Sequence, residues 1–187
     1  MEYGIKILMA AVVKNQPNNA LPTYDELFDL GPPTELADNP SFVTQDGYGG
    51  DEVRATVDKF SSCPISLGTT EFEHAAAAKI FGITLGAQAD ELPFSTGDKP
   101  PYIGLAGYHD YNSTDKGDKF RGVYFPVVKM HPVGKNYTTT TTSVNLTGER
   151  AEGKAIAAKN GVWRVYSKLF DTEAEAIAWV RQKLGGT

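Results

Sequence analysis

Residues 5–13, IKILMAAVV, decide how this chain is built. Apolar side chains occupy both alternating sets of positions, whereas a strand with one face in solvent would alternate apolar and polar residues. Lys6 interrupts the run, which is about half as long as the ~20 residues that a membrane-spanning helix needs. The pattern predicts a β-strand covered on both faces, and it indicates mature structure instead of a signal peptide.

Further strands are predicted where β-branched and aromatic residues, which fit a pleated surface, recur along the chain. Residues 52–58, EVRATVD, alternate apolar and polar side chains, so we expect a strand with one exposed face. Other stretches predict additional strands at residues 65–67, 102–108, 120–130 and 138–147. Asn160-Gly161 is the dipeptide best suited to a two-residue turn, so the flanking residues 154–159 and 162–168 are predicted to form a hairpin.

Two short helices are predicted from capping boxes, in which Ser or Thr is followed three residues later by Glu or Gln. Thr70 and Glu73 have this spacing, and apolar residues then recur at every fourth position. Thr172 and Glu175 have the same spacing ahead of an amphipathic stretch. The predicted helices lie at about 71–81, ending before Gly82, and at about 172–184.

One domain of mainly β structure with minor α content is expected over residues 1–187, because 41% hydrophobic content is enough to bury a core. Between Lys14 and about Pro40 the composition shifts to proline, asparagine and acidic residues, and proline blocks both helices and strand ladders. This predicts a Pro-rich arm or long loop at about 14–50. Its apolar residues indicate docking, since loops longer than ~15 residues are usually functional or ordered by a partner.

The chain has 18 basic and 23 acidic residues and a net charge of −5. This balance disfavours binding to phosphate backbones, which depends on clusters of Lys and Arg that release counterions. The segment from Asn15 to Asp58 contains nine acidic residues and one basic residue, Arg54. This composition fits a solvated acidic loop as well as a role in an interface. Cys63 is the only cysteine, so we expect neither a disulfide nor a thiolate zinc site, and synthesis in a reducing cytosol.

Residues that could carry catalysis or hold a metal lack the expected arrangements. The histidines are His74, His109 and His131, and no two have metal-ligand spacing. Asp110 could orient the His109 imidazole for base catalysis, but an ordinary boundary histidine is favoured, and Cys63 is best interpreted as a small buried thiol. Residues 110–118 contain many oxygen ligands but lack the glycine and glutamate of an EF-hand, which favours a solvated turn over calcium binding. No catalytic, cofactor or metal residue is predicted, and the chain is predicted not to be an enzyme.

Six strings, taken in order along the chain, carry a resemblance to a known family. They are GIKILMAAV (4–12), TQDGYGGDE (44–52), ISLGTTEFEHAAAAKIFG (65–82), PPYIGLAGY (100–108), KFRGVYFPVVKM (119–130) and SVNLTGERAEGKAIAAKNGVWRVYSKLF (143–170). They resemble the major tail protein family of long, flexible-tailed phages (siphophages), in particular the type common in phages of Gram-positive bacteria. The resemblance spans most of the chain, although the segment from Lys14 to Pro40 and the helix after Asp171 have no counterpart in it.

The resemblance implies a β-sandwich or partial barrel flanked by one helix, plus the C-terminal helix predicted above. Its subunits would form hexameric rings that stack into a tail tube, the conduit for DNA ejection. The protein would then be a self-assembling structural protein of the virion tail, synthesised in the host cytoplasm. Its implied partners are further copies of the chain, the tape measure protein, the tail terminator and the distal tail protein. DNA would pass through the lumen without specific binding, and no cofactor is implied.

Combined with this resemblance, the arm at about 14–50 is predicted to order against the adjacent ring. An acidic lumen that does not hold phosphate fits the net charge. The candidate contacts between rings or subunits are Leu21, Tyr24, Leu27, Phe28, Asp46, Tyr48 and Asp51.

Other interpretations stay open on the sequence alone. A monomeric β-sandwich that binds a ligand such as a carbohydrate would use exposed aromatic rings for stacking, although aromatic residues in strands more often belong to the core. The rings in question are those of Tyr102, Tyr108, Tyr111 and Trp163. A related secretion-tube or tail-completion protein would share the fold. Self-assembly distinguishes any tube protein from a monomeric binding module.

Overall fold

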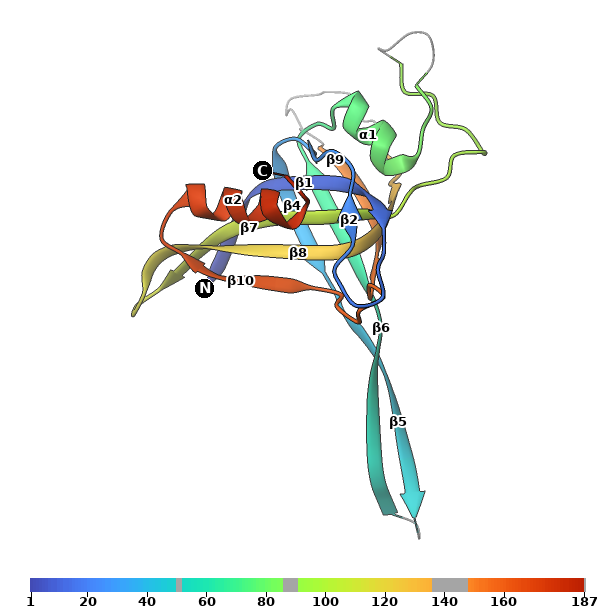
Figure 1. The fold of residues 1–187 in the computed structure, drawn as a ribbon, viewed down its shortest axis with the longest axis vertical. Coiled ribbons are helices and arrows are strands. Elements are labelled where there is room, and N and C mark those ends of the chain that lie inside the picture. The colour runs from blue at the N-terminus through green and yellow to red at the C-terminus, as the bar shows by residue number, and fades with distance from the viewer. Residues whose placement is uncertain (50–51, 86–90, 136–147, 187) are drawn as a thin grey trace, which may run out of the picture.

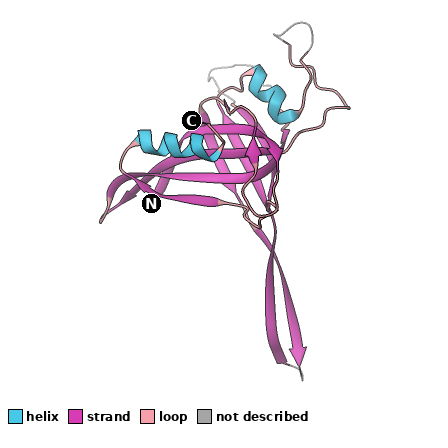
Figure 2. Ribbon diagram, viewed as in Figure 1, coloured by secondary structure: helices cyan, strands magenta, loops and turns pink. Residues whose placement is uncertain are grey.

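The structure is a computed structural model that describes residues 1–49, 52–85, 91–135 and 148–186. Over these residues the chain is mainly β with two α-helices, which confirms the predicted fold class (Figure 1, Figure 2). The strands are β1 (Glu2–Asn15), β2 (Thr23–Tyr24), β3 (Phe28–Asp29), β4 (Pro33–Asp38), β5 (Ser41–Gly49), β6 (Glu52–Thr69), β7 (Ile103–Ser113), β8 (Gly117–Pro132), β9 (Glu149–Ile156) and β10 (Val165–Phe170). The helices are α1 (His74–Phe81) and α2 (Glu173–Lys183).

The ten strands of the described residues form one antiparallel sheet, in which the main order is β2-β1-β7-β8-β9-β6-β4. β3 also pairs with β1, β10 with β8, and β5 with β6. The sheet curves strongly. As a result β4, the last strand in this order, comes close to β1 near the other end. Among the described residues no ladder joins β4 to β1, and the curved sheet is therefore open at this point.

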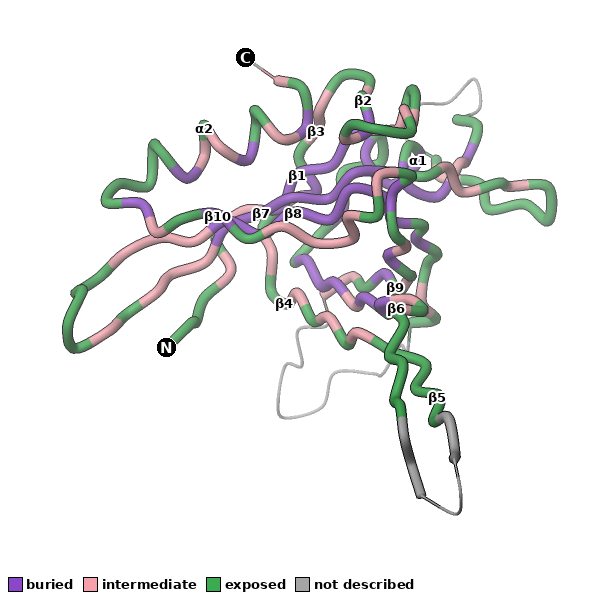
Figure 3. The backbone as a smooth tube through the Cα atoms, turned by 60° about the horizontal axis from the view of Figure 1, so that its bottom comes forward, coloured by how far each residue is buried: buried purple, intermediate pink, exposed green. Residues whose placement is uncertain are grey.

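β1 confirms the prediction that residues 5–13 form a strand covered on both faces. Leu8 and Ala10 are buried in one core, together with α1 and the concave side of the sheet. Met9 and Ala11 are buried in a second core beneath α2. Because successive side chains of a strand point to opposite faces, burial on both sides requires apolar residues at every position. Figure 3 shows the buried central parts of β1, β7 and β8 lying next to each other.

The C-terminal helix α2 matches its prediction, whereas α1 begins later than predicted. The Thr172 side chain accepts from the Glu175 backbone, and Glu175 reaches back to it, which confirms the second capping box. α1 begins at His74 without a side-chain cap, so the first capping box was predicted wrongly. The backbone N–H of Phe72 instead donates to the Glu149 carboxylate (2.7 Å), because β9 lies within reach of this turn.

The predicted hairpin around Asn160-Gly161 is wrong. The turn itself is present, with Gly161 at a φ of 83° and the Ala158 N–H donating to the Val162 carbonyl oxygen (2.8 Å). However, β9 and β10 do not pair with each other, because both pair with the same edge of the long strand β8, one after the other. Pro126 lies in β8 between the part that pairs with β10 and the part that pairs with β9, at a bulge. Proline has no N–H donor, and a bulge tolerates this.

β7 and β8 form the centre of the sheet, as predicted for residues 102–108 and 120–130. They pair from Ile103 to Ser113 and are joined by a tight turn with Gly117 at a φ of 64°. This turn contains the oxygen-rich run considered above as a calcium loop. The strand predicted at 138–147 lies outside the described residues.

The Pro-rich segment does not extend from the body as an arm. It contains β2, β3 and β4, and Leu30 within it is fully buried. The Tyr24 hydroxyl donates to the Pro126 carbonyl oxygen (2.8 Å) and is hydrogen-bonded to the Tyr124 hydroxyl. Burial raises the pKa of Tyr124 to about 12. Prolines stop regular ladders, but short strands between them still dock the segment on β1 and β6.

One pair of strands does leave the body. β5 and the first half of β6 form a long, twisted hairpin that projects beyond the sheet (Figure 1). The strands predicted at 52–58 and 65–67 are two parts of the same strand, β6. Its second half, Cys63–Thr69, pairs with β9 inside the body, so that the hairpin is a direct continuation of the sheet.

We predict that Glu149→Gln destabilises the fold in a pH-dependent way. Although burial alone would raise the pKa of Glu149, hydrogen bonds from Lys135 and from the Phe72 N–H lower it. A charged acceptor adds about 1 kcal/mol over a neutral one, so urea unfolding at pH 7 should show a loss of about that size. The pKa of the Glu149 carboxyl is lower in the folded chain than in the unfolded chain, where it is about 4.3. The stabilisation by the charged carboxylate is therefore complete above the unfolded pKa and is lost as the pH falls through the lower folded pKa.

The matched control is Glu26→Gln, at an exposed position. It should leave the free energy of unfolding unchanged at every pH. An E149Q penalty that persists unchanged at pH 3 would contradict the role of the charge.

Candidate assembly interface

The projecting hairpin is the part of the chain with the least support from its own body. β5 pairs with β6 from Ser41 opposite Ser62 to Gly49 opposite Glu52. Residues 41–46 and 55–59 are exposed throughout, which Figure 3 shows as a continuous exposed stretch. A hairpin of two strands is marginally stable in water by itself, so this element is a candidate for contact with another molecule.

One face of the hairpin is polar and acidic. Thr44 lies opposite Asp58 in the ladder, and its hydroxyl donates to that carboxylate (2.5 Å). Asp46 lies opposite Thr56 and accepts from its hydroxyl (2.7 Å). These cross-strand bonds hold two carboxylates in fixed positions on one side of an exposed ladder. We call this surface the acidic face of the hairpin.

The other face is apolar in its middle. Val43 lies opposite Lys59, and Gln45 lies opposite Val57. Val43 and Val57 are 60% and 64% exposed. They border a shallow hollow of about 340 Å³ that can receive a side chain from another molecule. We call this surface the valine face of the hairpin.

Aromatic rings fix the base of the hairpin to the body. The Phe60 ring stacks on Trp163 with centroids 4.6 Å apart and planes at 12°, and Phe42 meets Phe60 edge to face at 5.8 Å. The Arg164 guanidinium also lies over the Trp163 ring, 4.5 Å from its centroid. Such contacts contribute about 0.5–1.5 kcal/mol each beyond burial, so they set the direction in which the hairpin leaves the body.

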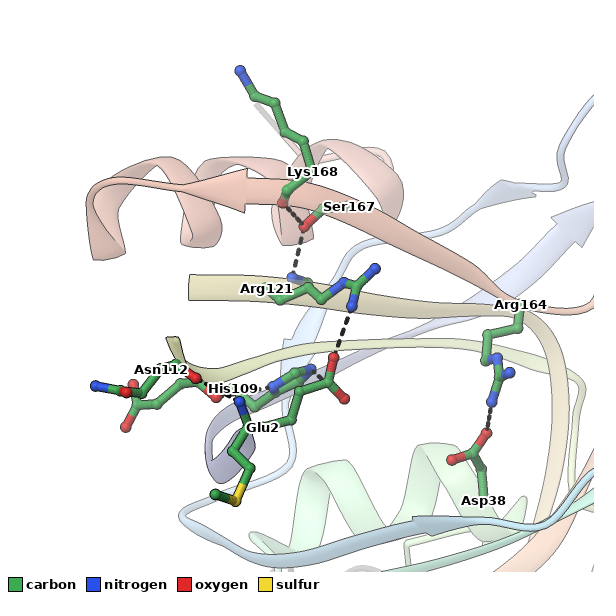
Figure 4. Close-up of polar contacts among 11 residues, drawn as sticks. Glu2, Asp38, His109, Asn112, Arg121, Arg164, Ser167 and Lys168 are labelled. Carbon is green, nitrogen blue, oxygen red and sulfur yellow. Dashed lines mark hydrogen bonds and ion pairs between the residues drawn. The ribbon is translucent and has the colours of Figure 1, made fainter. Parts of the chain in front are cut away.

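A cleft of about 400 Å³ with a mixed polar and apolar lining lies between β1 and β4, where the curved sheet is open. Glu2 accepts from Arg121 (2.8 Å) and lies 3.9 Å from the Nε2 atom of His109, while Arg164 is hydrogen-bonded to Asp38 (Figure 4). Each of the two carboxylates is thus balanced by an arginine of the same chain. The pairs tie β1 to β8 and β4 to the segment before β10, which is the arrangement of a structural ion-pair cluster.

The other residues considered for chemistry lie apart from one another. Cys63 is fully buried, and burial raises the pKa of its thiol, which keeps it protonated at neutral pH. His74 is the first residue of α1, and His131 lies in β8. Within residues 1–49, 52–85, 91–135 and 148–186, no cluster of His, Cys, Asp and Glu is arranged to hold a metal ion. In the same ranges, no helix is long and apolar enough to span a bilayer.

The predicted contact residues fall into two groups in the structure. Leu21, Tyr24 and Leu27 are half-buried against the α2 side of the body. Phe28 packs on the α1 side, where the Lys79 ammonium lies 4.9 Å from its ring. The apolar character of this segment is therefore explained by packing within the chain.

Asp46 lies on the acidic face of the projecting hairpin, as an exposed residue should for an intermolecular contact. The backbone of Tyr48 pairs with Val53 near the tip. The Tyr48 side chain and Asp51 lie outside the described part of the chain. Sequence analysis missed the valine face, although the alternation at 52–58 and the glycines before it were a sufficient signal for a hairpin.

A scan of the chain against protein-family models gives no match, and a search of the curated proteins gives no significant match. What the chain does is therefore inferred from the geometry of its own surfaces.

We predict that Trp163→Ala loosens the hairpin from the body. Removal of the ring deletes the Phe60 stack and the Arg164 contact, so trypsin should cleave after the exposed Lys59 at least several-fold faster than in the wild-type chain, as followed by mass spectrometry. Trp163→Phe, which keeps an aromatic partner, should stay close to wild type. Equal cleavage rates for W163A and wild type, with both chains folded by circular dichroism, would contradict this anchoring role.

Proposed function

We propose that this chain is a structural subunit that assembles with copies of itself into rings, and that the rings stack into the tail tube of a phage-like particle. The observation that supports this most strongly is the hairpin β5–β6. Beyond its base at Phe60 it projects from the body, and its exposed residues 41–46 and 55–59 present two chemically different faces.

Two physical properties of the hairpin favour contact with a neighbouring subunit. Exposed Val43 and Val57 gain free energy on burial, at roughly 25 cal/mol per Å² of apolar surface removed from water. The outer edges of a two-stranded ladder also present unpaired N–H and C=O groups, which invite pairing with another strand. A neighbouring subunit satisfies both needs, whereas water satisfies only the polar groups.

The open, curved sheet supports the same proposal. Sheets whose edges are completed by neighbouring subunits close into a rigid wall, and closure removes the edges that otherwise cause uncontrolled aggregation. Of the described residues, none pairs with the outer edge of β4. A tube made this way works by shape, and it needs no catalytic residue.

The charge of the chain suits a conduit for DNA. A net charge of −5 limits the Lys and Arg contacts that would hold phosphate electrostatically during transit. In this proposal the rings are hexameric, the particle is a long, flexible-tailed phage, and the subunit is synthesised in the host cytoplasm before it enters the virion tail. The tape measure, the tail terminator and the distal tail protein are its further partners.

The alternative, a monomeric carbohydrate-binding module, finds less support in the positions of its four aromatic residues. Tyr108 is buried and its hydroxyl donates to Glu173. The Trp163 ring is already in contact with the Phe60 ring and the Arg164 guanidinium. Tyr102 is exposed just before β7 and Tyr111 is half-buried near the other end of this strand, so the two rings do not form one platform.

We predict that the purified chain forms rings or tubes visible by negative-stain electron microscopy, and that Val43→Asp combined with Val57→Asp prevents their formation. Two charges on the valine face would have to be desolvated in any contact, which costs several kcal/mol. Light scattering after gel filtration should show V43D/V57D as a folded monomer. Ala157→Asp, at an exposed loop position, is the matched control and should assemble as wild type.

Two results would contradict the proposal. One is a wild-type chain that stays monomeric at every concentration up to the millimolar range. The other is V43D/V57D assembling as efficiently as the A157D control.

A further inference from the structure

Two lysines lie directly opposite each other on the outer side of the sheet. Lys129 on β8 pairs in register with Lys154 on β9, and both side chains are exposed. Like charges at directly opposed positions of an antiparallel pair are destabilising. Among the described residues neither lysine has an ion-pair partner, and the Lys129 ammonium instead lies 5.5 Å from the Tyr102 ring. Glu152 lies on the same face, two residues from Lys154 on β9, but within the described ranges it forms no ion pair with either lysine, so the pair is a local patch of positive charge.

The acidic face of the hairpin carries two negative charges. Asp46 and Asp58 each accept a hydrogen bond from a threonine hydroxyl, and within the described ranges neither has a cationic partner. The two carboxylates occupy diagonal positions of the ladder, about 7–8 Å apart by strand geometry. The two lysines start about 5 Å apart and have long, flexible side chains, so each ammonium can meet one carboxylate.

The two surfaces cannot meet within one molecule. Lys154 lies opposite Pro64 on β6, and Asp58 lies six residues further along the same strand. At a rise of about 3.3 Å per residue this places Asp58 about 20 Å away, beyond the reach of a lysine side chain, in the direction in which the hairpin leaves the body (Figure 1). Within the described part of the chain, these two surfaces can therefore meet each other only between two molecules.

We infer that the acidic face of the hairpin of one copy docks on the Lys129–Lys154 pair of a second copy. This inference rests on the proposed function and names the surfaces through which the subunits recognise one another. Copies with a net charge of −5 repel one another, and a local match of opposite charge such as this one offsets that repulsion and fixes which surfaces meet. The contact is heterologous, since it joins two different patches, and contacts of this kind generate closed rings or continuous filaments.

The first test is an exchange of charge between the two surfaces. Lys129→Glu with Lys154→Glu gives a chain with two acidic surfaces, and Asp46→Lys with Asp58→Lys gives a chain with two basic ones. Each double variant alone should require at least about tenfold higher concentration to assemble than wild type, because like charges would face each other. An equimolar mixture of the two variants should assemble within about threefold of the wild-type concentration, because every hairpin then finds a surface of opposite charge.

The second test places one cysteine on each surface. Asp46→Cys chains mixed with Lys154→Cys chains should form a disulfide-linked dimer under mild oxidation, detected on a non-reducing gel. The native Cys63 is fully buried and gives little background. Asp46→Cys mixed with Lys159→Cys, an exposed lysine in the turn after β9, is the control and should give no such dimer.

The outcomes separate this inference from the proposed function. Wild-type tubes together with unaffected charge variants and no cross-link would overturn the inference and leave the tube standing. A specific cross-link between chains that form no rings or tubes would support the contact and count against the tube. Monomeric wild-type chains without a cross-link would overturn both.

Discussion

A ladder of two antiparallel strands has two unpaired edges and two faces in water, and this constraint governs the organisation of the molecule. Inside the body every strand is covered or paired on at least one side, and β1 is covered on both. β6 belongs to both regions, since its second half pairs with β4 and β9 while its first half continues into the hairpin. The body can be stable as a monomer, whereas in the proposed assembly the hairpin gains its stability from neighbouring copies.

The body holds this hairpin in a defined direction. The stacked rings of Phe60 and Trp163 fix its base, and the same aromatic group is continuous with the core that contains α1. The ion pairs of the cleft between β1 and β4 keep the open side of the sheet in place. A rigid anchor matters for assembly, because a projecting element that is already oriented loses less conformational entropy when it binds. Local packing thus determines how precisely copies can be joined.

Much of the body could be predicted from local sequence patterns. The uninterrupted apolar run at 5–13 indicated two-sided burial, and Thr172 with Glu175 located α2, because both signals depend on neighbouring residues alone. The pairing around Asn160-Gly161 could not be predicted in this way. The dipeptide determines a turn, but the partner of each flanking strand depends on the free edge of β8, which is distant in sequence. The Pro-rich segment was misjudged for the same reason, since its docking depends on β1 and β6.

The candidate interface was predictable only in part. Asp46 belonged to an acidic, glycine-rich run that stood out by composition. The opposition of Lys129 and Lys154 is a matter of register between strands, and no local pattern contains that information.

Amide hydrogen exchange of residues 42–46 and 55–60, followed by mass spectrometry, tests the central claim most directly. It is measured once on the dilute monomer and once on the assembled protein. If the hairpin is held mainly by neighbouring copies, the amides of residues 42–46 and 55–59 exchange in the monomer much faster than those of β1 and β7, and assembly slows the hairpin amides by at least about tenfold. Hairpin amides that are as well protected in the dilute monomer as those of β7 would contradict the account.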